Sequence, residues 1–138
     1  MVKIIYSACH GGFGLSEAAM RRYAEIEGLR LYPEANPHGG DNVVLTYWTV
    51  PPEERGGILT GQEFASASED EQQASAARYK ACTINPHDIE RHDPALVQVV
   101  EELGAAASGA FADLKIAEIE GDRYRITEYY GWEDVVAL

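Results

Sequence analysis

A short stretch near the N-terminus, Cys9-His-Gly-Gly-Phe-Gly-Leu-Ser16, combines residue types that can bind a small anionic ligand. It follows an apolar run at residues 2–6 and precedes a helical pattern at residues 16–27. A glycine turn from a strand into a helix leaves backbone N–H groups unpaired and directs the positive end of the helix dipole to the same place. The ring of Phe13, between two glycines, could stack on a ligand ring. The stretch is therefore our candidate ligand site.

Arginine side chains would complete such a site, because a guanidinium group donates paired hydrogen bonds to phosphate. Arg91 and Arg21 are the first candidates, with Arg22 as an alternative to Arg21, although each could instead form a surface ion pair. The residues predicted to bind the ligand are His10, Gly11, Gly12, Phe13, Gly14, Ser16, Arg21 and Arg91.

The same glycines also have a purely structural interpretation, in which the turn needs them for positive φ angles. Their spacing differs from the dinucleotide-binding fingerprint, and the stretch lacks the lysine of a Walker-type phosphate loop. Phe13 could likewise be a buried plug. A ligand is favoured by the predicted helix cap, Ser16, because this neutral residue leaves the anion position free of a carboxylate.

Side chains with catalytic or metal-binding chemistry do not form a recognisable motif. Cys9 and His10 are neighbours on an extended chain and point to opposite sides, so they cannot form a nucleophile–base pair with each other. Residues 87–93 hold two histidines and two aspartates but no HExxH or CxxC spacing. We therefore predict no catalytic residues, no metal ion and no cofactor.

The N-terminal half predicts a strand–helix–strand unit. A strand at residues 2–8 leads into the helix at 16–27, which Ser16 caps and Gly28 ends. A short strand at 29–32 follows, with a right-handed parallel crossover as the default connection. The composition of residues 33–41 indicates a loop that contains His38. The β-branched and aromatic run at 43–50 predicts a central strand.

The second half begins with an acidic stretch at residues 51–75, which carries six acidic side chains and one basic one. We expect it to be a long loop or a lid, with a possible short helix around 69–78. A strand is predicted at 77–84. Asp93 and Pro94 predict the start of a helix that ends at 108–109. Residues 112–120 and 123–130 predict a hairpin around Gly121-Asp122, because that register aligns three pairs of opposite charge.

These elements predict one domain, residues 1–138, of the α/β (α+β) class. We expect a mixed sheet of about five or six strands, two helices mainly on one face, and a C-terminal β-hairpin followed by a short tail. Apolar residues on one face of the hairpin, together with Trp132 in the tail, would suit a homo-oligomer interface.

The net charge of −12 excludes some classes of partner. A chain this acidic repels nucleic acids and anionic membranes over most of its surface. It has no signal-peptide pattern and no apolar run long enough to span a membrane. Its two cysteines do not make a disulfide framework, so we expect a cytoplasmic protein.

Two stretches together resemble the signatures of a group of small, largely uncharacterised proteins of phages and bacteria. One is Gly11-Gly-Phe-Gly-Leu-Ser16, and the other lies in residues 89–104 and contains Asp93-Pro-Ala-Leu-Val-Gln-Val-Val-Glu-Glu-Leu-Gly104. Residues 112–119 continue the similarity, and the chain departs from the group at His10, where the group has tyrosine. The resemblance implies a phage-encoded cytoplasmic α/β protein of a bacterial host and supplies no catalytic residues.

We expect a non-enzymatic protein that binds and sequesters a small nucleotide-derived ligand, for example a host immune signalling nucleotide. The alternative is an inhibitor that binds a host protein through its acidic surface. A third possibility is a nucleotide hydrolase with His10, His87 or His92 as general base.

Overall fold

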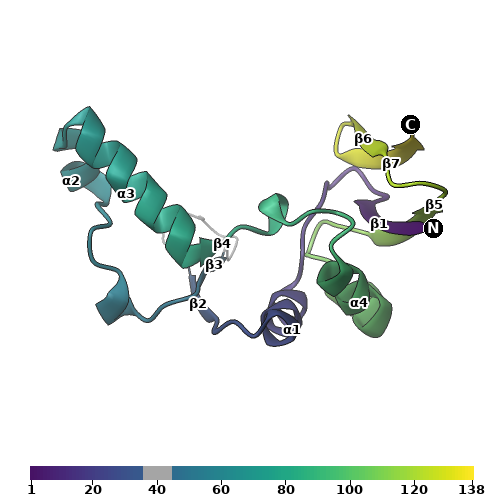
Figure 1. Cartoon of the computed structure of the whole chain (residues 1–138), viewed down its shortest axis with the longest axis horizontal. Helices are drawn as coiled ribbons and strands as arrows, with labels where there is room; N and C mark the ends of the chain where they lie inside the picture. The colour runs from purple at the N-terminus through teal and green to yellow at the C-terminus, as the bar shows by residue number, and fades with distance from the viewer. Residues whose placement is uncertain (36–44) are drawn as a thin grey trace. The chain divides into compact units, whose positions relative to one another are not determined.

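The computed structural model of the chain describes residues 1–35 and 45–138, which belong to two units (Figure 1). One unit contains residues 1–29 and 86–138, and the other contains the described residues between 30 and 85. His38 and the first two residues of the strand predicted at 43–50 lie outside the described residues.

The first unit is built around its N-terminal strand. Its elements are β1 (Val2–Ser7), α1 (Glu17–Glu27), η2 (Pro86–Asp88), α4 (Pro94–Leu103), η3 (Gly104–Ala107), β5 (Leu114–Ile119), β6 (Tyr124–Tyr129) and β7 (Trp132–Ala137). β1 pairs antiparallel with β5, and α4 packs against both strands while α1 packs against α4 (Figure 1). Ile4 and Ile5 of β1 are completely buried. Burial of each isoleucine side chain is worth roughly 1.5–3 kcal/mol. The packing of β1 between β5 and α4 therefore forms the core of this unit.

The hairpin of this unit differs from the predicted one. β6 pairs with β7 around Tyr130-Gly131, whereas β5 pairs with β1, so the predicted hairpin of residues 112–120 with 123–130 is wrong. Each cross-strand charge pair that favoured it is worth only roughly 0.2–1 kcal/mol, less than the burial of either Ile4 or Ile5. Tyr130 and Gly131 have φ angles of 46° and 87°. Positive φ at both central residues is the signature of a type I′ turn.

Both predicted helices of the first unit begin where expected. Ser16 and Asp93 are the N-caps of α1 and α4, and Gly28 ends α1 in the left-handed conformation. α4 ends earlier than the predicted 108–109, because Gly104 has φ of 58° and the chain continues as the 3-10 helix η3. Glycine adopts such a φ angle at little cost and therefore ends helices readily.

The second unit contains a small antiparallel sheet and two helices. Its elements are β2 (Tyr32–Ala35), β3 (Leu45–Trp48), η1 (Pro52–Glu54), α2 (Gly61–Ser66), α3 (Glu69–Cys82) and β4 (Thr83–Ile84). The strand order is β2-β3-β4, so Pro33, which was predicted to lie in the loop at 33–41, belongs to an edge strand, where a missing N–H is tolerated. The acidic stretch 51–75 is largely helical, and most of the strand predicted at 77–84 is the end of α3.

A capping box explains why α3 forms. The Ser68 side chain accepts the backbone N–H of Glu71, and the Glu71 side chain accepts the backbone N–H of Ser68. The residues that follow include alanine, arginine and lysine, which favour helix over strand. The motif Ser-x-x-Glu was visible in the sequence and predicts this helix start.

The prediction of a mixed α+β fold is confirmed. The strands of the described chain form three small antiparallel sheets rather than one mixed sheet. The predicted parallel crossover is wrong, because β1 and β2 belong to different sheets.

Candidate binding site

The glycine stretch of the candidate site is packed against other parts of its own unit. A Cβ atom at Gly11 would collide with the backbone carbonyl of Phe111. Gly12 has φ of 83°, and the N–H of Gly109 donates to the carbonyl of Gly14 at 2.9 Å. Packing thus accounts for Gly11 and backbone conformation for Gly12, whereas a Cβ atom at Gly14 would meet nothing closer than 4.0 Å.

Ser16 caps α1 and is itself bonded to η3. Its Oγ accepts the N–H of Ala19 at 3.1 Å and donates to the carbonyl of Ala106 at 2.6 Å. Its backbone N–H donates to the carbonyl of Ala107 at 2.9 Å. The start of α1, where the sequence suggested an anion, is therefore in contact with another segment of the chain.

Phe13 and Arg91, which the sequence suggested as ligand contacts, bind each other. The guanidinium carbon of Arg91 lies 3.6 Å from the centroid of the Phe13 ring, and Phe13 is only 9% exposed. Glu133 accepts two hydrogen bonds from Arg91, at 2.7 and 2.9 Å, and is itself buried. Paired, nearly parallel bonds of this kind are the strong form of the arginine–carboxylate interaction.

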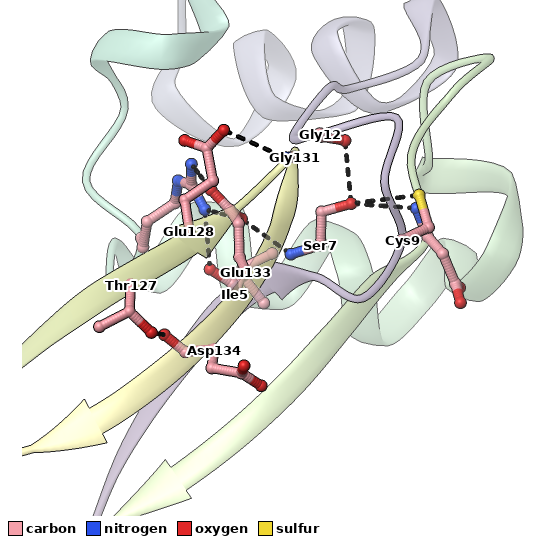
Figure 2. A network of polar contacts seen from close by, with 11 residues as sticks. Ile5, Ser7, Cys9, Gly12, Thr127, Glu128, Gly131, Glu133 and Asp134 are labelled. Carbon is pink, nitrogen blue, oxygen red and sulfur yellow. Dashed lines mark hydrogen bonds and ion pairs between the residues drawn. The ribbon is translucent and has the colours of Figure 1, made fainter.

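The Arg91–Glu133 pair also occupies the outer edge of β1. The Ile5 N–H donates to the Arg91 carbonyl at 2.8 Å, and the Ser7 N–H donates to Glu133 Oε1 at 2.9 Å. Ser7 Oγ donates in turn to the Gly12 carbonyl at 2.9 Å (Figure 2). One network therefore connects the glycine stretch, β1 and β7, and an edge that would otherwise be open is covered.

Arg21 is not part of this network. Its Nε donates to Glu17 Oε2 at 3.1 Å, and its side chain is 53% exposed. Arg22 pairs with Glu25 and Glu102, and its hydrogen bonds lower the pKa of Glu102 to about 2. Exposed pairs of this kind contribute little stability.

The reactive side chains of the stretch contact backbone carbonyls. The Cys9 thiol donates to the carbonyl of Phe111 at 3.0 Å, and His10 Nδ1 lies 3.1 Å from the carbonyl oxygen of Tyr130. Through these contacts the glycine stretch packs against the segment before β5 and against the turn between β6 and β7.

An exposed group of aromatic residues lies at that turn, and we call it the aromatic tip: His10, Tyr129, Tyr130 and Trp132. The three larger side chains are 70%, 78% and 40% exposed, respectively. The rings of His10 and Trp132 are 5.4 Å apart, and those of Tyr129 and Tyr130 are 4.6 Å apart. Of the residues predicted to bind a ligand, only His10 belongs to this surface.

The tip is held firmly in place. A Cβ atom at Gly131 would collide with the carbonyl oxygen of His10, so the turn lies directly on the glycine stretch. The Gly131 N–H donates to Glu128 Oε1 at 3.2 Å (Figure 2). His10 and Trp132 were suggested from the sequence as a ligand contact and an interface residue, but the turn that brings them together was missed, because Tyr-Gly is not a preferred turn sequence, whereas Gly-Asp nearby is.

A separate open groove of about 500 Å³ shares no residue with the glycine stretch. Its lining includes Lys3, His92, Pro94, Val97, Gln98 and Glu101. His92 Nδ1 lies 2.7 Å from the hydroxyl oxygen of Tyr124. Burial of Tyr124 raises the pKa of its hydroxyl above the usual value. Within residues 1–35 and 45–138, no three His, Cys, Asp or Glu side chains are grouped as a metal site requires.

Scans of protein-family models, curated proteins and solved structures each find no match to this chain. None of the helices in the described part of the chain has the length and apolar character needed to cross a membrane.

Proposed function

We propose that this protein acts by binding another protein, without catalysis, and that the aromatic tip is the contact surface. The observation that carries the proposal is the conformation of Tyr130. It is the one non-glycine residue with positive φ among the described residues, and its side chain is 78% exposed. A bulky residue in that conformation is destabilising, and such strain concentrates at functional positions.

The composition of the tip suits a protein partner. Tyrosine and tryptophan dominate the binding energy of protein interfaces because they bury a large area with few rotatable bonds. The turn that bears them packs on the glycine stretch through Gly131 and His10. A surface already fixed in its bound conformation loses less entropy when a partner binds.

The state of the polar side chains supports binding over catalysis. The Cys9 thiol and the His10 ring are each engaged with a backbone carbonyl, of Phe111 and Tyr130. This arrangement does not place a base beside a nucleophile.

A small nucleotide-derived ligand, sequestered at the same tip, is our second candidate. The neighbouring rings of His10 and Trp132 favour it, because a nucleobase stacks on such surfaces. We rank it second because Phe13 and Arg91 bind each other, Arg21 binds Glu17, and the chain carries a net charge of −12. A phosphate would need a cation that these contacts already use.

The proposal places the interaction in the cytoplasm of a bacterial host of a phage. It rests there on the resemblance of the sequence to phage and bacterial proteins and on the two free cysteines.

The test uses a variant that removes two of the four rings of the tip and keeps the turn. In Tyr130→Asn/Trp132→Thr, the turn becomes Asn-Gly, the preferred type I′ sequence, and threonine suits a strand. The control is Phe64→Ala, which removes an exposed ring from the other unit. Affinity purification from a bacterial lysate should recover a protein with the wild type and the control but not with the tip variant.

Thermal unfolding should show that the tip variant is at least as stable as the wild type, so lost binding cannot be attributed to unfolding. Native mass spectrometry of the wild type mixed with a cellular nucleotide pool covers the second candidate. A bound nucleotide mass that depends on Trp132, without a protein partner, would replace the first proposal with the second. Recovery of the same protein by the tip variant would contradict the first.

A further inference from the structure

We propose that the partner surface is basic and that the aromatic tip holds an arginine or lysine side chain of the partner against its rings. This inference rests on the proposed function and specifies the chemistry of the partner. The faces of aromatic rings attract cations, tryptophan most strongly. Tyr129, Tyr130 and Trp132 offer such faces on one turn, with large exposed fractions.

The charges around the tip favour a cation. The hairpin segment 124–137 contains three acidic residues and one basic residue, Arg125. Of the acids, Glu133 is neutralised by Arg91, whereas Glu128 and Asp134 are exposed. The strand register places Asp134 on the same face of the hairpin as Tyr129 and Trp132. An incoming cationic side chain on that face would therefore meet aromatic rings and the Asp134 carboxylate together. The net charge of −12 adds long-range attraction for a basic surface and speeds its approach.

The same charges disfavour the other occupants. A second copy of this chain would bring Glu128 and Asp134 of both molecules together, and like charges destabilise an interface. An acidic or nucleotide ligand would meet the same repulsion. We therefore do not propose a second copy of the chain as the occupant of the tip. The homo-oligomer expected from the sequence is tested as the alternative.

The experiment uses the 138-residue chain and three synthetic peptides that differ only in one repeated residue: arginine, lysine or citrulline. Citrulline keeps the shape of arginine and removes its charge. Binding is followed by NMR, because the two tryptophans, Trp48 and Trp132, give separate indole N–H signals. The arginine peptide should shift the Trp132 signal and leave that of Trp48 unchanged. The lysine peptide should produce a smaller shift, and the citrulline peptide none.

A charge-neutral substitution separates ring recognition from general attraction between opposite charges. Trp132→Leu should weaken the affinity for the arginine peptide about two- to fivefold, the loss expected for one exposed cation–π contact. Phe64→Ala, with the same net charge, should leave the affinity unchanged. Equal affinities of all three proteins, or shifts confined to the acidic first turn of α3, would overturn the inference.

The inference and the proposed function fail in different ways. If the tip variant loses its protein partner but the wild type ignores all three peptides, the proposed function stands and the basic partner is wrong. If sedimentation shows that the protein forms dimers that Trp132→Leu dissociates, a second copy occupies the tip and the inference is wrong. Arginine-peptide binding at Trp132 without any protein partner in the lysate would contradict the proposed function alone.

Discussion

Two arginines among the described residues are each held between an aromatic ring and a carboxylate. In the first unit Arg91 lies over Phe13 and binds Glu133. In the second unit Arg55 lies 4.0 Å from the Trp48 ring centroid and binds Glu34 at 2.6 Å. The aromatic ring packs on one face of each guanidinium group, and the carboxylate accepts hydrogen bonds from the N–H groups at its edge. These two contacts offset the desolvation penalty of largely burying the positive charge.

Glu133→Gln tests the pair in the first unit. Glutamine can still accept the Ser7 N–H but leaves the partly buried charge of Arg91 uncompensated, so we expect a loss of about 2–4 kcal/mol in the free energy of unfolding. Urea denaturation measures this loss in the free energy of unfolding. The matched control is Glu101→Gln, which breaks the exposed pair with Lys3 and should lose less than about 1 kcal/mol. Similar losses in both variants would show that burial of the pair is unimportant.

Tyr23 gives the protein a predictable response to alkaline pH. Burial, assisted by the hydrogen bond to Asp93 at 2.9 Å, raises the pKa of Tyr23 above its usual value of 10. The folded protein therefore keeps this proton at a pH where the unfolded chain releases it. The contribution of Tyr23 to stability is complete below pH 10 and is lost as the pH rises further.

The variant Tyr23→Phe should be less stable than wild type by about 1 kcal/mol at neutral pH, because one hydrogen bond is lost. The difference should shrink above pH 10. Denaturation midpoints of both proteins, measured from neutral pH to above pH 10, give this difference in stability. A difference that stays constant with pH would contradict the raised pKa of Tyr23.

At the scale of elements, Gly131 joins the hairpin to the glycine stretch. Alanine at this position would have an unfavourable positive φ and would also collide with the His10 carbonyl. Gly121 is a matched control in the same unit, because its φ of 82° is similar and the space around it is open. Gly121→Ala should lose about 1 kcal/mol of stability and Gly131→Ala at least about 2–3 kcal/mol. Equal losses would mean that the hairpin does not pack on the stretch.

The capping box of α3 makes a prediction about local stability in the second unit. Because α3 buries only Ser75 and Cys82, its cap should contribute a large share of its stability. Ser68→Ala should lower the protection of α3 amides against hydrogen exchange about fivefold, which corresponds to about 1 kcal/mol. Thr60→Ala is the control, because Thr60 occupies the N-cap of α2 without a side-chain cap bond. An equal effect of both substitutions would contradict the role of the box.

The elements that the sequence predicted well are those specified by nearby residues. The N-caps Ser16 and Asp93 lie next to the helices that they start, so α1 and α4 were predictable. The pairing of β1 with β5 was not, because it joins positions as distant as Val2 and Ile119. A local charge pattern predicted a hairpin instead, and burial of the first strand outweighs such a pattern.

The contrast between contacts of nearby residues and contacts of distant residues also explains how much of the candidate site could be predicted. Phe13 and Arg91 were identified and do meet, but Glu133, which binds Arg91, comes from a distant strand and has no distinguishing neighbour in the sequence. His10 and Trp132 were named from the sequence, but not their meeting at one surface, because the turn Tyr130-Gly131 depends on contact with the glycine stretch rather than on a preferred turn sequence. The glycine stretch thus supports a binding surface instead of forming one.

Site-specific cross-linking shows whether the aromatic tip contacts a protein partner. Tyr130 is replaced by the photoreactive residue p-benzoylphenylalanine, with the same replacement of Phe64 as control, and each protein is irradiated in a bacterial lysate. We expect one discrete protein adduct from position 130 and none from position 64. Absence of an adduct at position 130, or the same adduct from both positions, would contradict such a contact.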